Sequence, residues 1–411
     1  MHALDSSNQN SRMNRKLLAA IAGSSAMGIG IGLHRSQFAV LGELMAANGW
    51  FANSTIGILS GISLAGYIIG CLQQSKIKSE KTNIICIRYG LVIAVITFFI
   101  EPLSSVIEWQ AFWRLTAGWA SAQLVVGIPG FVTRQQPAHD HRFLVAWTIS
   151  GSGIAAFIAS LLVSLFASAS VVGAWFVTGA LSLLLAWPIN DLLSLSKQEI
   201  YGSKESEQYH TYEEKKPHPS IAYLSKPLAF LAVSAFFFGA AQAAVIVYYP
   251  LLLISKFEIG QSLAQALFSS LGLGYMLGAI GVGFLPNRYT TDTAMTFSAF
   301  IGLIGVFMCA ASPLIEIVGL GGFLFGLWNG SMISLLLDRI NQSTESHLAR
   351  VTWSRFSLIL SIGFTIGATC LSPIANNNVA LIMWISLFLL AIHLTSQSIS
   401  KHLFSRKTDL K

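Results

Sequence analysis

A histidine and an arginine stand side by side within a long apolar run of the chain. The stretch from residue 27 to residue 38 reads MGIGIGLHRSQF, which places His34 and Arg35 after a series of glycines and aliphatic residues. A guanidinium can make charge-assisted, often bidentate hydrogen bonds with a carboxylate or a phosphate. Imidazole is the side chain whose charge changes closest to neutral pH. Binding of an anion and binding of a proton are therefore the two kinds of chemistry that this stretch could perform.

Three further arginines lie in apolar runs: Arg88, Arg114 and Arg355. An arginine at mid-helix in a bilayer costs roughly 2.5 to 3.5 kcal/mol on insertion scales, so a deep one should face protein or a wet cavity. Arg88 and Arg355 are about five residues from a predicted helix end, from which such side chains can reach the interface. Arg35 and Arg114 are the deeper pair. We predict that they bind the substrate, with Arg355 as a secondary candidate.

The first helix has small residues on the face that carries Arg35. At about 100° per residue, Gly28, Gly32, Arg35, Ala39 and Gly42 form one stripe. Such a stripe can simply pack against a neighbouring helix. A lone arginine in that interface would need a buried partner, so we favour exposure to a cavity.

His34 has two readings that the sequence leaves open. It could bind a coupling proton, or it could be a neutral histidine whose ring is hydrogen-bonded to a backbone carbonyl. No acidic residue is predicted deep in a span, because Glu43 and Glu316 are near the outer helix ends and Asp338 is at the cytoplasmic edge. The cavity is therefore predicted to be net positive. Such a site favours a small organic anion and excludes organic cations.

The composition defines the elements that must position these side chains. Of 411 residues, 54% are hydrophobic and 10% are charged, whereas about a quarter of the residues of a soluble globular chain are charged. A helix of about 20 apolar residues crosses a bilayer. We predict an all-α membrane protein with twelve transmembrane helices, at 17–45, 54–72, 84–100, 109–132, 143–167, 171–189, 227–253, 263–285, 294–311, 314–337, 351–372 and 379–399.

The basic residues predict the orientation. With both termini in the cytoplasm, 20 of the 25 lysines and arginines fall in cytoplasmic segments, and only Lys256 falls on the other face. This asymmetry follows the positive-inside rule and explains the net charge of +7 without nucleic-acid binding. We predict a multi-pass protein of a bacterial inner membrane. Residues 1–189 and 227–411 would form two six-helix bundles, and the polar segment 190–226 a cytoplasmic linker.

One offset relates the two halves. Gly66-Tyr-Ile-Ile-Gly70 in the second predicted span corresponds to Gly274-Tyr-Met-Leu-Gly278 in the eighth, a shift of 208 residues. The same shift relates Gly118 to Gly326 and Arg142 to Arg350. A shared register predicts two halves in the same orientation, which enclose a site at their interface.

The same offset extends the candidate site into the second half. By this offset, Gln242 in the seventh helix corresponds to His34. Tyr249 lies seven residues after Gln242, on the same face of that helix. We predict both as neutral hydrogen-bonding partners of the substrate. Asn329 shares a face of the tenth helix with glycines, so it faces either a neighbouring helix or the cavity.

These features resemble a known family. Twelve spans as six plus six, a long central loop and Arg114-Leu-Thr-Ala-Gly118 are similar to the major facilitator superfamily. Gly32-Leu-His-Arg35 and the Gly-Tyr-x-x-Gly motif resemble the YbfB/YjiJ branch. This chain departs from the pattern of that branch at two positions, with His34 in place of a glycine and Glu43 in place of a proline. The resemblance implies a secondary active transporter that works by alternating access. The loop after the second span lacks the Asp and Gly of the usual gating motif, so a charge lock on that face is not expected from it.

Other classes of protein are less well supported. The four cysteines have no metal-ligand spacing, and no nucleotide-binding motif occurs, so we predict no cofactor and no direct use of ATP. We do not expect an enzyme, and we expect a monomer whose partners are a small anionic molecule, protons and the bilayer. Efflux of a metabolite, siderophore or drug is an alternative transport function. A non-transporting sensor and a membrane-embedded enzyme are more distant alternatives.

Overall fold

The protein is all-helical in the parts described by the computed structural model, whose backbone covers residues 2–77, 79–134, 140–166, 170–202, 226–286, 289–344, 346–375 and 377–408. The first span is built from α1 (His2–Met27), η1 (Gly28–Ser36) and α2 (Gln37–Ala47). The rest of the first half comprises α3 (Asn53–Lys76), α4 (Glu80–Ile100), the short η2 (Glu101–Leu103), α5 (Ile107–Arg134), α6 (His141–Phe166) and α7 (Val171–Gly202). The second half comprises α9 (Lys226–Phe257), α10 (Gln261–Gly283), α11 (Thr291–Ala311), α12 (Ile315–Ser343), α13 (Ser346–Ala375) and α14 (Val379–Thr408).

Twelve helical segments of the described chain are long and apolar enough to cross a membrane. This confirms the predicted number of spans. Helices of this length satisfy their own backbone hydrogen bonds, which is what a lipid-facing segment requires. Of the predicted linker, residues 203–225 lie outside the described residues, and α7 continues beyond residue 189, where the sixth span was predicted to end.

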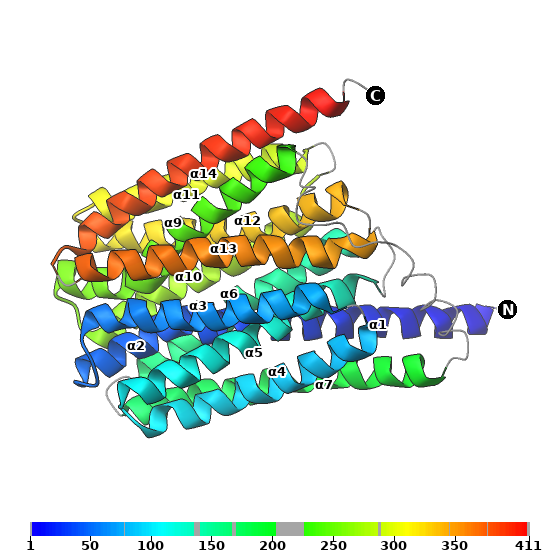
Figure 1. Cartoon of the computed structure of the whole chain (residues 1–411), viewed down its shortest axis with the longest axis horizontal. Helices are drawn as coiled ribbons and strands as arrows, with labels where there is room; N and C mark the ends of the chain where they lie inside the picture. The colour runs from blue at the N-terminus through cyan, green and yellow to red at the C-terminus, as the bar shows by residue number, and fades with distance from the viewer. Residues whose placement is uncertain are drawn as a thin grey trace.

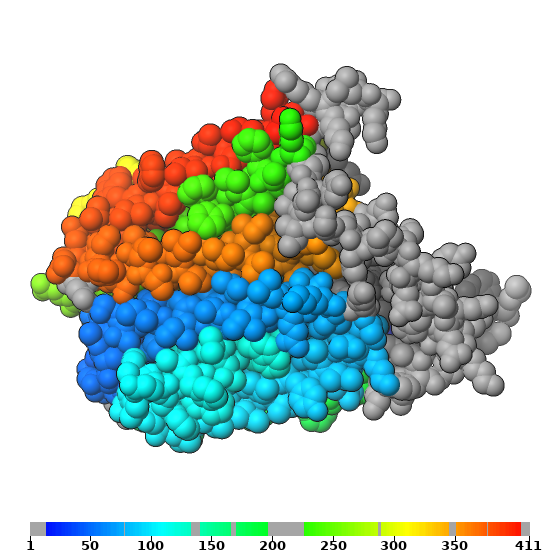
Figure 2. All heavy atoms as spheres, in the orientation of Figure 1, coloured from blue at the N-terminus to red at the C-terminus, as the bar shows by residue number. Residues whose placement is uncertain are grey.

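The helices form two groups that run side by side (Figure 1). The groups meet where α6 packs on α10 and α3 packs on α13. The start of α1 and the last turn of α14 lie at the same end of the molecule (Figure 1), and we call this end the terminal face and the other end the opposite face. Figure 2 shows α3 and α13 in contact along their length on the viewed side.

Glycines let α3 and α5 approach each other closely. A Cβ added to Gly66 would overlap the backbone carbonyl of Leu115, and one added to Gly118 would overlap the carbonyl of Ser63. Only a residue without a side chain permits this approach. The Gly-Tyr-x-x-Gly motif therefore has a packing role.

The second half repeats these contacts at the predicted offset. A Cβ on Gly274 would overlap the carbonyl of Phe323, and one on Gly326 would overlap that of Leu271. Each of these residues is 208 positions after its counterpart in the first half. The α10–α12 pair thus reproduces the α3–α5 pair residue by residue.

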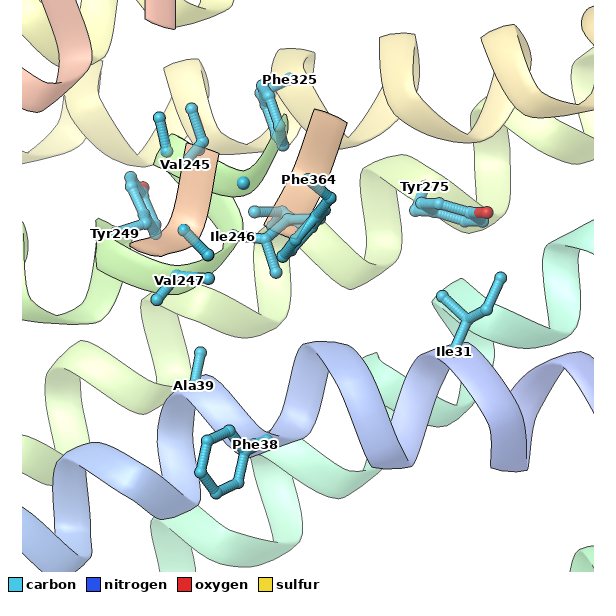
Figure 3. Close-up of a cluster of buried hydrophobic side chains, with 14 of the residues drawn as sticks. Ile31, Phe38, Ala39, Val245, Ile246, Val247, Tyr249, Tyr275, Phe325 and Phe364 are labelled. Atoms are coloured by element: carbon cyan, nitrogen blue, oxygen red, sulfur yellow. The ribbon is translucent and has the colours of Figure 1, made fainter. Parts of the chain in front are cut away.

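The apolar core extends across the seam between the two groups. Figure 3 shows Ile31 and Ala39 of the first span on the side toward Val247 of α9 and Phe364 of α13, whereas Phe38 points to the other side, into the first half. These side chains belong to one buried cluster that includes residues of both halves. The seam is therefore closed by hydrophobic contacts at mid-depth.

Candidate functional site

The first span changes its helical winding where His34 and Arg35 occur. Residues Gly28–Ser36 form a π-helix, and the backbone N–H of Gln37 donates to the carbonyl of Gly32. A π-helical turn inserts extra residues into a helix and is frequent at functional sites. It also changes which residues share a face. The single stripe predicted from 100° per residue is therefore wrong.

The glycines of that segment face different neighbours. Gly28 and Gly32 lie against α6, where a Cβ on Gly28 would come within 3.1 Å of Ala155 and one on Gly32 within 2.6 Å of the Ser152 carbonyl. Arg35 instead lines the seam between the two halves. The small residues pack helices together, and the arginine is turned away from them.

A small cavity lies at this point of the seam. It is lined by His34, Arg35 and Phe38 of the first span, Ser60, Ser63 and Tyr67 of α3, Ser121 of α5, Val247 of α9 and Phe364 of α13. Its volume is about 20 Å³, which is room for roughly one water molecule. The structure thus represents a state in which the centre of the protein is nearly closed.

Arg35 has no ionic partner among the described residues. Its Nε and Nη2 make no hydrogen bond, and its Cζ lies 4.0 Å from the centroid of the Phe364 ring. The titratable side chains around it are Tyr67, Cys71 and Tyr275, which are neutral near pH 7 when unperturbed. A cation–π contact compensates only part of the cost of burying a charge. This half-buried guanidinium therefore has unused capacity to bind an anion.

Arg114 is in a different position from the one predicted. Its side chain is fully buried, and its Nη2 donates to Glu101 Oε2 at 2.6 Å. Its Nη1 donates to the His34 carbonyl at 3.1 Å, and Phe38 covers its guanidinium with the ring centroid 4.2 Å away. Arg114 does not line the cavity. It braces the π-helical segment, because the hydrogen bond to His34 connects α5 to the first span.

Glu101 is the residue that the sequence reasoning missed. It directly follows the predicted third span, and it lies in η2, fully buried. The prediction of a site made net positive by two arginines considered acidic residues of the spans only, and it did not take Glu101 into account. Glu101 neutralises Arg114, whereas Arg35 has no ionic partner in the described part of the chain. An acidic residue next to Pro102 at the end of an apolar run was the available signal.

His34 adopts the geometry of the second of its two readings. Its Nε2 lies 2.9 Å from the carbonyl of Ala94, and its ring stacks on Phe98 with centroids 4.0 Å apart. A carbonyl only accepts, so Nε2 carries the hydrogen. Nδ1 has no hydrogen-bond partner. This geometry is that of a neutral ring in contact with the cavity.

The remaining candidates are not part of the cavity lining. Tyr249 is buried and donates to the Val318 carbonyl at 2.8 Å, so it joins α9 to α12 and offers no free hydroxyl. Gln242 is 2% exposed, and its Nε2 has no partner. Asn329 is fully buried with both amide atoms unpartnered. Arg355 is half-buried in α13 and lies away from the cavity. The structure therefore brings only His34 and Arg35 together there.

Ionic contacts close the terminal face. Arg142 of α6 pairs with Asp338 of α12 at 3.0 Å, which connects the two halves. The same carboxylate accepts from Thr291 at 2.9 Å and from Gln342 at 2.9 Å. A charge lock is present on this face, built from residues outside the expected motif.

Hydrogen bonds between the halves also occur on the opposite face. Ser372 of α13 donates to the Ser54 carbonyl of α3 at 2.5 Å. Gln261 Nε2 of α10 donates to Glu43 Oε1 of α2 at 3.4 Å. The halves are in contact at both faces, so the cavity beside Arg35 is enclosed from both sides.

Comparison with known proteins agrees with this architecture. The protein family described as "Uncharacterised MFS-type transporter YbfB" matches residues 25–395. The chain belongs to this family. Its fold is similar to that in a crystal structure of the nucleoside transporter NupG in a mutant form, with a TM-score of 0.66 and 14% sequence identity. The similarity covers 94% of this chain and 99% of NupG. No curated protein matches the sequence significantly.

The comparisons confirm the predicted fold class and the resemblance to this family. The chain is a multi-pass membrane protein and an MFS-type transporter of twelve helices. Transport is not an enzymatic activity, which agrees with the expectation that the protein is not an enzyme. At 14% identity, the likeness to NupG concerns the fold alone.

Proposed function

We propose that this YbfB-family protein transports a small organic anion, or a metabolite that bears a carboxylate, by alternating access. Arg35 would hold the anionic group in the central cavity. The observation that carries the proposal is the guanidinium of Arg35, which is half-buried at the seam and has no ionic partner among the described residues. A carboxylate or phosphate would supply the missing charge and acceptors through charge-assisted hydrogen bonds.

The surroundings of Arg35 support a small substrate with further polar groups. The hydroxyls of Ser60, Ser63, Tyr67 and Ser121 come from α3 and α5 on the same cavity. They can donate to or accept from hydroxyl or amino groups of the bound molecule. An organic cation would be repelled by Arg35, so the site selects against it.

Alternating access follows from the contacts at the two faces. The Arg142–Asp338 pair must separate for the cavity to open toward the terminal face. The contacts of Ser372 with Ser54 and of Glu43 with Gln261 must separate for it to open toward the opposite face. We propose that the two halves rock about the cavity between these states, with the present structure as the occluded intermediate.

The membrane setting and the driving force are part of the proposal. The excess of basic residues in the segments at the terminal face supports a cytoplasmic position for this face under the positive-inside rule. We propose a bacterial inner membrane as the location and a proton gradient as the driving force. Uptake and export both fit the cavity, because the site itself is the same for either direction.

A ligand-stabilisation screen tests the anion site. The purified protein would be heated with mono- and dicarboxylates, phosphate esters, nucleosides and organic cations. A ligand at 100 times its Kd stabilises the folded state by about 2.7 kcal/mol, which raises the Tm measurably. We expect protection by one class of anion, and loss of that protection in Arg35→Gln.

The control is Arg88→Gln, which removes a half-buried arginine of α4 that does not line the cavity. Protection by the anion should persist in this variant. The proposal is wrong if nucleosides or cations alone protect the protein, or if Arg35→Gln is protected as well as the native chain.

A further inference from the structure

One carboxylate at the seam has not been given a role by the proposed function. Glu43 lies in α2 near the opposite face and is 6% exposed. Its Oε1 accepts a long hydrogen bond of 3.4 Å from Gln261, and its Oε2 has no hydrogen-bond partner among the residues that the structure describes. Because α2 belongs to the first half and α10 to the second, this contact spans the seam.

The elements packed on α2 are η1, α3, α6, α7 and α9, and one further carboxylate, Glu258, lies in the α9–α10 connection three residues before Gln261. On η1 the titratable groups are His34, bonded to Ala94, and Arg35, which contacts Phe364. On α9, Lys256 lies near the opposite face but is placed over the Phe257 ring. Tyr248 and Tyr249 donate to the carbonyls of Ala368 and Val318. None of these groups forms an ion pair or hydrogen bond with Glu43.

The other charged groups of these elements are at the far ends of their helices. The described ones are Lys76 of α3, His141 and Arg142 of α6, Asp191 of α7 and Lys226 of α9. They belong to the terminal half of the molecule, many helical turns from Glu43. Tyr67 and Cys71 of α3, together with Tyr275 of α10, surround Arg35 instead.

A buried carboxylate in this position cannot easily stay ionised. An ionised carboxylate without a cation or a full set of donors pays a large desolvation cost, whereas the neutral carboxyl group does not. The N-terminus of α10 gives no backbone N–H to Oε2. The closed seam therefore favours a proton on Glu43, and separation of α2 from α10 would let water reach the group.

We propose that Glu43 binds a proton when the opposite face is open and that its protonation allows this face to close. The inference rests on alternating access from the proposed function, and it names Glu43 rather than His34 as the group whose protonation changes between the open and closed states. His34 is the weaker candidate because its ring is already fixed by Ala94 and Phe98. The proton is taken from water at the open face by the carboxylate oxygen and is returned when the carboxyl group is hydrated again.

A distance measurement as a function of pH tests this proposal without a substrate. Spin labels at Asn48→Cys, after α2, and Ser255→Cys, near the end of α9, would report separation of the halves at the opposite face. The full chain would carry Cys86→Ser and Cys370→Ser, because these two thiols are partly or fully exposed. In lipid nanodiscs, both faces meet the same buffer.

The native chain should shift toward the short, closed distance as the pH falls. Glu43→Gln mimics the neutral carboxyl group, so it should stay closed at all pH values, with the pH-dependent amplitude reduced at least tenfold. Glu316→Gln removes an exposed carboxylate near the same face and should titrate like the native chain. Gln261→Leu removes the bonding partner and should lower the closed fraction at low pH.

The proposal is overturned if Glu43→Gln titrates like the native chain, or if the native distance does not change with pH. If Glu43→Gln does not fold, an unchanged closed fraction in Gln261→Leu overturns it. Arg35→Gln should keep the full pH response. A failure of the anion-binding proposal would therefore appear in the ligand screen and leave this distance measurement unaffected.

Discussion

The buried Arg114–Glu101 pair allows a quantitative test of how the first span is held. Both side chains are fully buried, and Arg114 also donates to the backbone carbonyl of His34. Removing one partner of a buried ion pair leaves an uncompensated charge, which typically costs 3–5 kcal/mol. We therefore expect Glu101→Gln to lower the free energy of unfolding by about 3–5 kcal/mol.

Removing the other partner, Arg114, should lower the free energy of unfolding at least as much, because a second contact is lost. Arg114→Leu leaves Glu101 unpaired and also leaves the His34 carbonyl without its donor, which adds about 1–3 kcal/mol. The double variant Glu101→Leu/Arg114→Leu removes both charges. Apolar replacement of a whole buried pair is often nearly neutral, so the double variant should be more stable than either single variant.

Reversible unfolding in detergent measures these differences, and Glu101→Leu is added so that the native chain, Glu101→Leu, Arg114→Leu and the double variant form a double-mutant cycle. The cycle isolates the coupling between the two side chains. Glu316→Gln, at an exposed carboxylate, serves as the control and should change stability by less than about 0.5 kcal/mol. The reasoning is refuted if Glu101→Gln costs less than about 1 kcal/mol, or if the double variant loses the sum of the two single losses.

Four further substitutions, one of them a control, test other contacts. Asp338→Asn weakens the partly buried ion pair with Arg142 on the terminal face by about 1 kcal/mol. Thiol labelling of the buried Cys71 should therefore become about five times faster. An unchanged labelling rate would contradict the role of this pair in closing the face. Gly66→Ala should lower the free energy of unfolding by about 1–3 kcal/mol through overlap with α5. Gly281→Ala, with open space around it, should not lower it, which unfolding measurements would check. Tyr249→Phe should lose about 1 kcal/mol of stability but keep full ligand protection in the thermal screen, whereas lost protection would return this residue to the binding site.

The composition was sufficient to predict the helices. Long apolar runs with few charges can only be helices in a bilayer, because lipid offers the backbone no hydrogen bonds. The offset between the halves was also encoded locally. Gly66 and Gly118 recur as Gly274 and Gly326, and the backbone carbonyls that they approach recur at the same shift.

Arg35 could be identified from the sequence because the cost of a charged side chain in an apolar segment depends on that residue alone. A charge in an apolar run is costly wherever it points, so its presence predicts a cavity or a partner. Which of the two applies depends on neighbours that are distant in the sequence. Arg35 lines a cavity, whereas Arg114 forms an ion pair with Glu101.

The tertiary structure decided the chemistry of the site. Glu101 meets Arg114 because η2 turns the chain back toward α5, and the π-helix of Gly28–Ser36 redirects Arg35 away from the glycines around it. The sequence by itself determined which segments cross the membrane, since burial in lipid depends on local composition. Only the packing of helices determined which charges are neutralised and which remain free, because the energy of a buried charge is set by the groups within a few ångströms of it.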